Sequence, residues 1–162
     1  AVPFDPLWDL HPPEFHILHM MGKPVASPRW SQAFGRDYRY SGNVNVALPI
    51  PLSLQPFLDA ARTLDTRING LLVNWYDGDL GHYIGKHRDS PVGLIEGAPI
   101  ITLSLGAPRT FRFRKYRGAG MVDVDTGEHA VIVFGGQVNR VFSHEVLKGE
   151  GRRISITARA FR

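Results

Sequence analysis

Residues 74–90 read NWYDGDLGHYIGKHRDS and form the densest polar stretch of the chain. The stretch contains a His-x-Asp triplet, His87-Arg88-Asp89. Side chains alternate between the two faces of an extended strand, so His87 and Asp89 would share one face while Arg88 points away. One imidazole nitrogen and one carboxylate oxygen on the same face can bind one metal ion. The alternative is an ordinary polar surface pair, because a single triplet of this kind arises easily by chance.

A third ligand is available in residues 141–162, VFSHEVLKGEGRRISITARAFR. His144 follows an apolar run and a Gly135-Gly136 turn, and several strands fit between it and the triplet. Two histidines and one carboxylate, with open positions left on the metal, form the facial triad of non-haem iron enzymes. We therefore predict that His87, Asp89 and His144 bind one metal ion. The remaining histidines are expected to be solvated or hydrogen-bonded: His11, His16, His19, His82 and His129.

Two arginines near the end of the chain suggest an anion site. Arg153 and Arg159 have the same parity along a predicted strand, and the arginine fork matches a carboxylate through two parallel hydrogen bonds. An inward-facing arginine needs an anion, because unpaired buried charge is costly. Six residues of strand span roughly 20 Å, more than a small dicarboxylate. The side chains must therefore converge, or the strand must bend, or one arginine partly serves Asp89. An arginine-rich edge facing water is the alternative.

The hydropathy pattern predicts a mainly β protein with flanking helices. Residues 53–65 have apolar side chains at helical spacing, with Ser53 as the expected cap. Residues 15–30 read as two short strands joined by a turn at Gly22-Lys23-Pro24. Short strands separated by turns indicate a sandwich or barrel, with one or two helices packed outside. The remaining strands are expected at 70–76, 99–105, 110–114, 130–134 and 153–161.

Composition narrows the class of protein further. The chain has 162 residues, a net charge of +4 and no cysteine. Disulfides, thiolate nucleophiles and cysteine-based metal sites are therefore excluded, and a cytoplasmic or nuclear setting fits better than secretion. No segment approaches the roughly 20 apolar residues that span a bilayer, so no membrane partner is expected. The positive charge favours an anionic partner such as nucleic acid.

The order and spacing of the motifs resemble the AlkB family of oxygenases. The matching strings are Asn74-Trp75-Tyr76, His87-Arg88-Asp89, His144, the R-x5-R from Arg153 to Arg159, and PIITLSLG at 99–106. The resemblance implies a double-stranded β-helix, also called a jelly-roll barrel. It also implies iron(II) on the predicted triad, O2 as cosubstrate, and 2-oxoglutarate held by Asn74, Tyr76, Arg153 and Arg159.

The same resemblance places substrate-facing residues near the start of the chain. Residues 1–162 would form a single domain, with residues 1–14 irregular and 15–45 forming a lid over the site. Core packing is the alternative role for the aromatic side chains, and a solvated hairpin is the alternative for the basic run around 109–117. Met20, Met21 and Val25 at a hairpin could wedge into a duplex. The expected substrate contacts are Arg29, Trp30, Phe34, Tyr38, Tyr40, Arg109 and Arg112.

The function implied is oxidative demethylation of N-alkylated bases in DNA or RNA by a monomer, with release of succinate, CO2 and formaldehyde. The chain departs from the family where Ser90-Pro91 stands in place of an acidic residue that follows the triplet, which leaves base selectivity open. Ser155 and Ala158 replace the Asn and Phe often found in the last strand. Two alternatives stay open: the same chemistry on a small molecule or protein, and a non-catalytic nucleic-acid binder.

Overall fold

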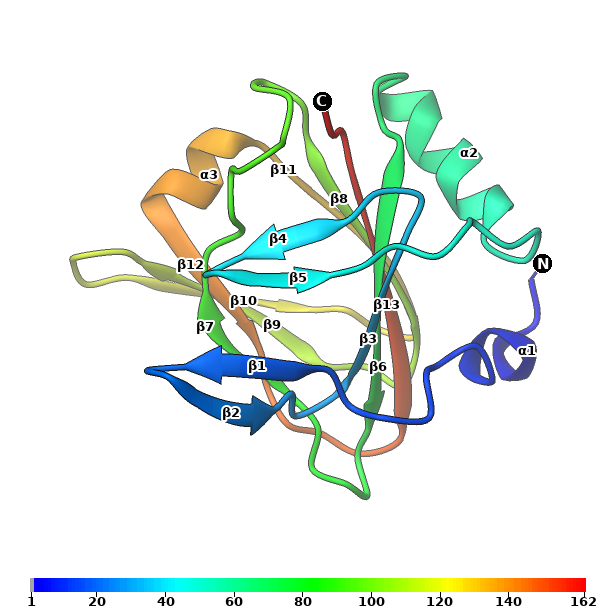
Figure 1. Ribbon diagram of the computed structural model, residues 1–162. Coiled ribbons are helices and arrows are strands. Elements are labelled where there is room, and N and C mark those ends of the chain that lie inside the picture. The colour runs from blue at the N-terminus through cyan, green and yellow to red at the C-terminus, as the bar shows by residue number, and fades with distance from the viewer. Residues whose placement is uncertain (1) are drawn as a thin grey trace.

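The computed structural model describes residues 2–162 and contains two antiparallel sheets that form a barrel (Figure 1). The mainly β, jelly-roll architecture expected from the sequence is confirmed. The large sheet has the spatial order β11 (His129–Phe134), β8 (Ile100–Gly106), β13 (Arg152–Arg159), β6 (Gly70–Asp77) and β3 (Trp30–Phe34). The small sheet has the order β10 (Met121–Asp125), β9 (Thr110–Lys115), β12 (Phe142–Val146) and β7 (Ile84–His87).

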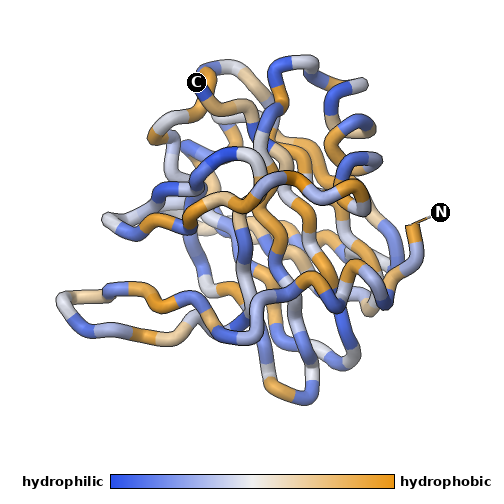
Figure 2. Tube along the Cα trace, turned by 45° about the vertical axis from the view of Figure 1, so that its right-hand side comes forward, coloured by the Kyte–Doolittle hydropathy of each residue, from blue (hydrophilic) through white to orange (hydrophobic). Residues whose placement is uncertain are grey.

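Strand β13 separates the hydrophobic core from the interior cavity. Ile154, Ile156 and Ala158 are fully buried on its outer face, among the core residues of β6 and the helices. On its other face, Ser155, Thr157 and Arg159 line the cavity between the sheets. This period of two is what an extended strand buried on both sides dictates. Figure 2 shows the hydrophobic stretches gathered in the strands beside the helices.

Helix α1 (Phe4–Trp8) corrects the prediction that residues 1–14 are irregular. The prolines around it suggested a loop, but Pro6 falls in the first turn, where its missing N–H would have had no helical partner anyway. Leu7 and Trp8 enter the core, and the Trp75 indole N–H donates to the carbonyl of Leu7 at 2.9 Å. These contacts fix a helix too short to persist alone.

Helix α2 (Gln55–Leu64) lies where residues 53–65 were expected, but Ser53 does not cap it. The helix begins after Leu54, with Pro56 in its first turn, a position where the fixed φ of proline is already helical. Leu58 and Ala61 pack against the large sheet. The third helix, α3 (Gly136–Val141), was not predicted and leads directly into β12. In the described residues no helix is long and apolar enough to cross a membrane.

The segment expected to be a lid is only partly outside the sheets. It contains two hairpins, β1 (Ile17–Met20) with β2 (Lys23–Ala26), and β4 (Tyr38–Tyr40) with β5 (Asn43–Asn45). Residues 30–34, however, form β3 at the edge of the large sheet. The first turn lies at Met21-Gly22, where both residues have positive φ, rather than at Gly22-Lys23-Pro24. The hairpin turn needs left-handed backbone at these two positions, which proline cannot adopt.

Candidate metal and cosubstrate site

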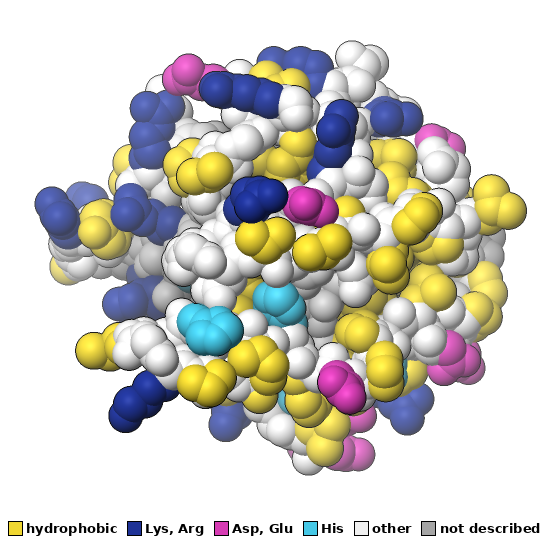
Figure 3. Space-filling model, in the orientation of Figure 1, with side chains coloured by type: hydrophobic (Ala, Val, Ile, Leu, Met, Phe, Trp, Pro, Cys, Tyr) yellow, Lys and Arg dark blue, Asp and Glu magenta, His cyan; other side chains and the backbone are white. Residues whose placement is uncertain are grey.

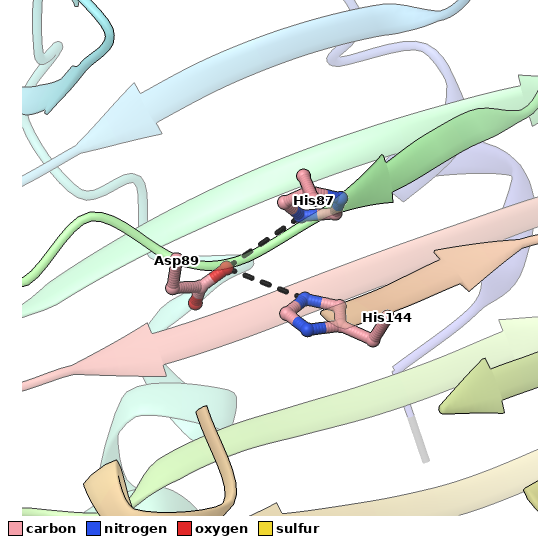
Figure 4. Close-up of side chains that lie close together, drawn as sticks. All are labelled: His87, Asp89 and His144. Carbon is pink, nitrogen blue, oxygen red and sulfur yellow. Dashed lines mark ion pairs between the residues drawn. The ribbon is translucent and has the colours of Figure 1, made fainter. Parts of the chain in front are cut away.

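The small sheet and the loop that follows it bring the predicted triad together. His87 ends β7 and His144 lies in the neighbouring β12, where the two are direct cross-strand partners. Asp89 follows β7 in an extended loop. Its Oδ1 lies 3.3 Å from Nε2 of His144 and 3.6 Å from Nε2 of His87 (Figure 4). One donor atom from each residue lies within 4.8 Å of the other two, so this donor set can hold one cation.

The Nε2 atoms of both imidazoles face Oδ1 of Asp89. Nδ1 of His87 lies 2.8 Å from the carbonyl of Gly85, and this contact orients the ring. The ring of His144 stacks on Phe111 at 5.4 Å. Burial lowers the pKa of His144, which favours the unprotonated ring that a metal requires.

Asp89 divides its two carboxylate oxygens between two tasks. Nε and Nη2 of Arg159 both donate to Oδ2, at 3.0 and 2.6 Å, while Oδ1 faces the imidazoles. Burial alone would raise the pKa of this carboxyl, but Arg159 and the two histidines hold it well below its usual range. Asp89 therefore stays ionised, and one oxygen remains available as a ligand. One of the three alternatives given for the two arginines was that one of them partly serves Asp89. The structure shows that this arginine is Arg159.

A residue that the sequence did not single out fixes the backbone of Asp89. The side-chain amide of Asn139 in α3 makes two hydrogen bonds to this residue. Its Oδ1 accepts from the Asp89 N–H at 2.9 Å, and its Nδ2 donates to the Asp89 carbonyl at 2.9 Å. Nothing in the local pattern GGQVNRV marks this contact, because it joins residues far apart in the chain.

Arg153 is completely buried and has no acidic partner within residues 2–162. Its Nη2 donates to Ser104 at 2.7 Å, and its guanidinium lies 5.0 Å from the ring centre of Tyr76. Its Nε and Nη1 are buried without any hydrogen-bond partner in the described residues. Burial lowers the pKa of Arg153, because an unpaired charge is poorly solvated there. A carboxylate of 2-oxoglutarate fits this unsatisfied fork.

A cavity of about 1170 Å³ lies between the sheets, beside these groups. Asn74 and Tyr76 from β6 line it, together with the triad and Arg159. Oδ1 of Asn74 accepts a hydrogen bond from Nε of Arg29 at 2.9 Å, which leaves its Nδ2 free to donate. The residues expected to hold 2-oxoglutarate thus lie on adjacent strands, with Ser155 opposite Asn74 and Arg153 opposite Tyr76.

The expected substrate contacts divide into two groups. Arg29, Tyr38 and Tyr40 line the cavity. Tyr38 and Tyr40 stack on each other at 5.2 Å, and Arg159 lies 4.5 Å from the centre of the Tyr38 ring. Burial raises the pKa of Tyr38 to about 12, so its phenol stays protonated.

The other four expected contacts are corrected by the structure. Phe34 is core, and Trp30 stacks between His11 and Phe15 because β3 belongs to the sheet rather than to a lid. Arg109 is buried outside the cavity and donates to the carbonyls of Glu150 and Gly151. Arg112 lies on the outside of the small sheet, paired with Asp123 at 2.6 Å.

Comparison with known proteins decides the family. Residues 14–159 match the model of the 2OG-Fe(II) oxygenase superfamily. The chain belongs to this superfamily. Human and mouse DNA oxidative demethylase ALKBH2 are 30% and 31% identical to this oxygenase over 108 residues, which is 60% of the chain and 38% and 42% of those proteins. The solved structure of OsALKBH1 shares the fold, with a TM-score of 0.55 and 17% identity over 96% of this chain and 89% of that one.

These comparisons confirm the AlkB-like resemblance and the expected cofactors of the oxygenase, iron(II) and 2-oxoglutarate, with O2 as cosubstrate. The chain spans less than half the length of the curated relatives named above. The assignment of individual residues to iron, cosubstrate and substrate stays a prediction.

Proposed function

We propose that this chain is an iron(II)- and 2-oxoglutarate-dependent dioxygenase that demethylates N-alkylated bases in DNA or RNA. Residues 1–162 would act as one domain and as a monomer, in the cytoplasm or nucleus. Bound iron(II), with 2-oxoglutarate and O2, supplies the oxidation of the N-methyl group. The hydroxymethyl base then releases formaldehyde, while 2-oxoglutarate becomes succinate and carbon dioxide.

The side chains divide this work. His87, Asp89 and His144 bind the iron, and Arg159 and Asn139 hold Asp89 in place. Arg153 takes the distal carboxylate of 2-oxoglutarate, with Tyr76 beside it. The cavity walls exclude water from the reacting groups, which is the protein's part in cofactor chemistry. The observation that carries the proposal is a metal-competent triad in one cavity with Tyr76, whose ring lies 5.0 Å from the buried, unpaired guanidinium of Arg153.

The cationic mouth of the cavity supports nucleic acid as the substrate. Four basic side chains line it and are exposed: Lys86, Arg88, Arg140 and Arg162. None of these forms an ion pair within residues 2–162. Figure 3 shows basic side chains crowding the left and upper margins of this face, on the side of the β9–β10 hairpin and α3. Such a rim suits a phosphate backbone, which provides most of the sequence-independent affinity.

The rim continues onto the tip of the β9–β10 hairpin. The guanidinium of Arg88 lies 4.0 Å from the ring centre of Tyr116, and the guanidinium of Arg117 lies 5.3 Å from the same ring centre. Through Arg88, which follows β7, the cationic rim thus contacts the hairpin tip, and Arg117 adds a further cation there. A base flipped out of the strand could then enter between this rim and Tyr38, whose stacked pair with Tyr40 offers an aromatic surface.

A screen of methylated oligonucleotides tests the proposal. Purified protein with iron(II) and 2-oxoglutarate is incubated with each oligonucleotide, and loss of the methyl mass is measured together with succinate and formaldehyde. We expect methyl loss from at least one N-methyl base, and no loss with His87→Ala. His129→Ala, an exposed histidine outside the site, is the matched control and should retain activity. Succinate release that only a small molecule or a protein stimulates would overturn the choice of nucleic acid.

A further inference from the structure

Arg29 is a second buried arginine without an acidic partner in the part of the chain that the structure describes. It precedes β3, is 8% exposed and lines the cavity. Its Nε donates to Asn74, but its two terminal nitrogens make no hydrogen bond within residues 2–162. No carboxylate in that part of the chain lies within 4.0 Å of its guanidinium. A buried guanidinium with free donors on a cavity wall is directed at something that enters the cavity.

The groups around Arg29 cannot neutralise it. Burial, and then the charge of Arg29, lower the pKa of His16. Burial raises the pKa of Tyr40, and Arg29 opposes that shift. Burial also lowers the pKa of His82, with Arg29 among the smaller causes. All three side chains are neutral near pH 7, so Arg29 stands in a partly buried and uncharged setting where its field is weakly screened.

Binding of the cofactors does not remove the positive excess. The two charges of iron(II) cancel those of 2-oxoglutarate, and Asp89 cancels Arg159, to which it is hydrogen-bonded. Arg153 and Arg29 remain, and both are more than nine-tenths buried. A substrate group that brings another positive charge into this cavity is therefore repelled, whereas a neutral group with carbonyl oxygens can accept the free N–H donors.

We propose that Arg29 makes this cavity select neutral, carbonyl-bearing N-methyl bases over cationic N-methyl bases. The inference rests on the proposed function and names the lesion class. Methylation at N3 of thymine leaves a neutral ring with carbonyl oxygens on both sides of the methyl group. Methylation at N3 of cytosine gives a ring of nearly the same shape that carries a positive charge. The guanidinium donates to a carbonyl of the first and opposes the charge of the second.

Among the described residues, Glu96 is the other acidic side chain on the cavity wall besides Asp89. It lies in the loop between β7 and β8 and is exposed, with no ion pair or hydrogen bond in the described residues. Water and salt screen an exposed carboxylate strongly, so it offsets little of a buried charge. Glu96 therefore serves as the matched control for the charge of Arg29.

The test measures binding rather than turnover. Protein with iron(II) and 2-oxoglutarate, kept free of oxygen, is titrated into fluorescently labelled oligonucleotides that differ only in carrying 3-methylthymine or 3-methylcytosine. We expect the methylthymine strand to bind more tightly, on the order of tenfold. Arg29→Gln should bring the two dissociation constants within about twofold of each other, whereas Arg29→Lys and Glu96→Gln should keep the preference. Thermal denaturation verifies that each variant is folded.

The possible outcomes distinguish failure of the role of Arg29 from failure of the proposed demethylation of nucleic acid. Equal binding of both strands, tighter binding of the methylcytosine strand, or a preference unchanged in Arg29→Gln would overturn the role of Arg29 and leave demethylation intact. If Arg29→Gln weakens 2-oxoglutarate binding as much as an Arg153 variant does, Arg29 belongs to the cosubstrate site and the inference also fails. If neither strand binds better than its unmethylated counterpart, nucleic acid is not the substrate, and both proposals fail.

Discussion

Two arginines on strand β13 are almost equally buried but have opposite electrostatic surroundings. Arg159, 5% exposed, makes two hydrogen bonds to the carboxylate of Asp89. Arg153, 0% exposed, has one hydroxyl and one aromatic ring as its polar neighbours, and two of its nitrogens are unsatisfied. The fold supplies a counterion to Arg159, whose Nη1 alone lacks a partner, but none to Arg153 within residues 2–162. The same strand therefore carries an ion pair at one end and, in our proposal, a cosubstrate-binding arginine at the other.

Removal of Asp89 should have the largest effect, because it breaks both the metal site and the ion pair. Asp89→Ala leaves Arg159 buried without a counterion, and we expect a loss of about 3–5 kcal/mol in the free energy of unfolding. Turnover should be abolished. His87→Ala should abolish turnover with little loss of stability, because the His87 side chain is one-third exposed. Chemical denaturation and succinate release measure the two effects.

Asp123→Ala is the matched control for this prediction. It removes an exposed carboxylate that pairs with Arg112 on the outside of the small sheet, and should leave both stability and turnover close to wild type. A wild-type unfolding free energy for Asp89→Ala would contradict the view that Arg159 depends on this carboxylate.

Arg153→Met, unlike Asp89→Ala, should not lower the free energy of unfolding. The ligand-free variant should be at least as stable as wild type, because an unpaired buried charge is replaced by an apolar side chain of similar length. Its affinity for 2-oxoglutarate should fall by about 100-fold, the usual cost of removing one partner of a buried charge pair. Melting temperatures with and without 2-oxoglutarate measure both effects, since a ligand of the folded state raises the melting temperature. An unchanged shift on adding 2-oxoglutarate would remove Arg153 from the cosubstrate site.

The sequence allowed the triad to be predicted but not the division between the two arginines. His87 and Asp89 are close in the chain, so strand alternation suffices to place them on one face. The parity of Arg153 and Arg159 correctly directed both inward. Which of them meets Asp89 depends on where the loop after β7 crosses β13, and no local pattern encodes that crossing. Helix α1 was missed for a related reason, because the burial of Leu7 and Trp8 against distant strands fixes it.

Asn139→Ala should have an intermediate effect, on the affinity of the triad for iron. It removes both hydrogen bonds to the backbone of Asp89 while keeping the ligand itself. Residues that orient metal ligands typically contribute 10- to 100-fold to affinity, so we expect iron binding to weaken by about tenfold. Gln137→Ala, an exposed residue in the same helix, is the control. Equal iron affinity in the two variants would show that the loop holds Asp89 without the amide.

The smallest predicted effect concerns pH and Arg29. Burial and Arg29 lower the pKa of His16 below its ordinary value of 6.5. The folded protein then binds fewer protons than the unfolded chain below this value, so this contribution to stability is present above pH 6.5 and declines as the pH falls. In Arg29→Gln the pKa of His16 should move back toward 6.5, and the decline should lessen. Titration of the His16 ring by NMR measures the shift; an unchanged pKa would show that burial alone is responsible.

Calorimetric titration of iron(II) without oxygen, on wild type and on His144→Ala, tests the three-ligand site most directly. We expect one ion per wild-type chain, and no comparable binding when His144 is replaced, although His87 and Asp89 are still present. A full equivalent of iron bound with undiminished affinity by His144→Ala would contradict the metal site on which the proposed function depends.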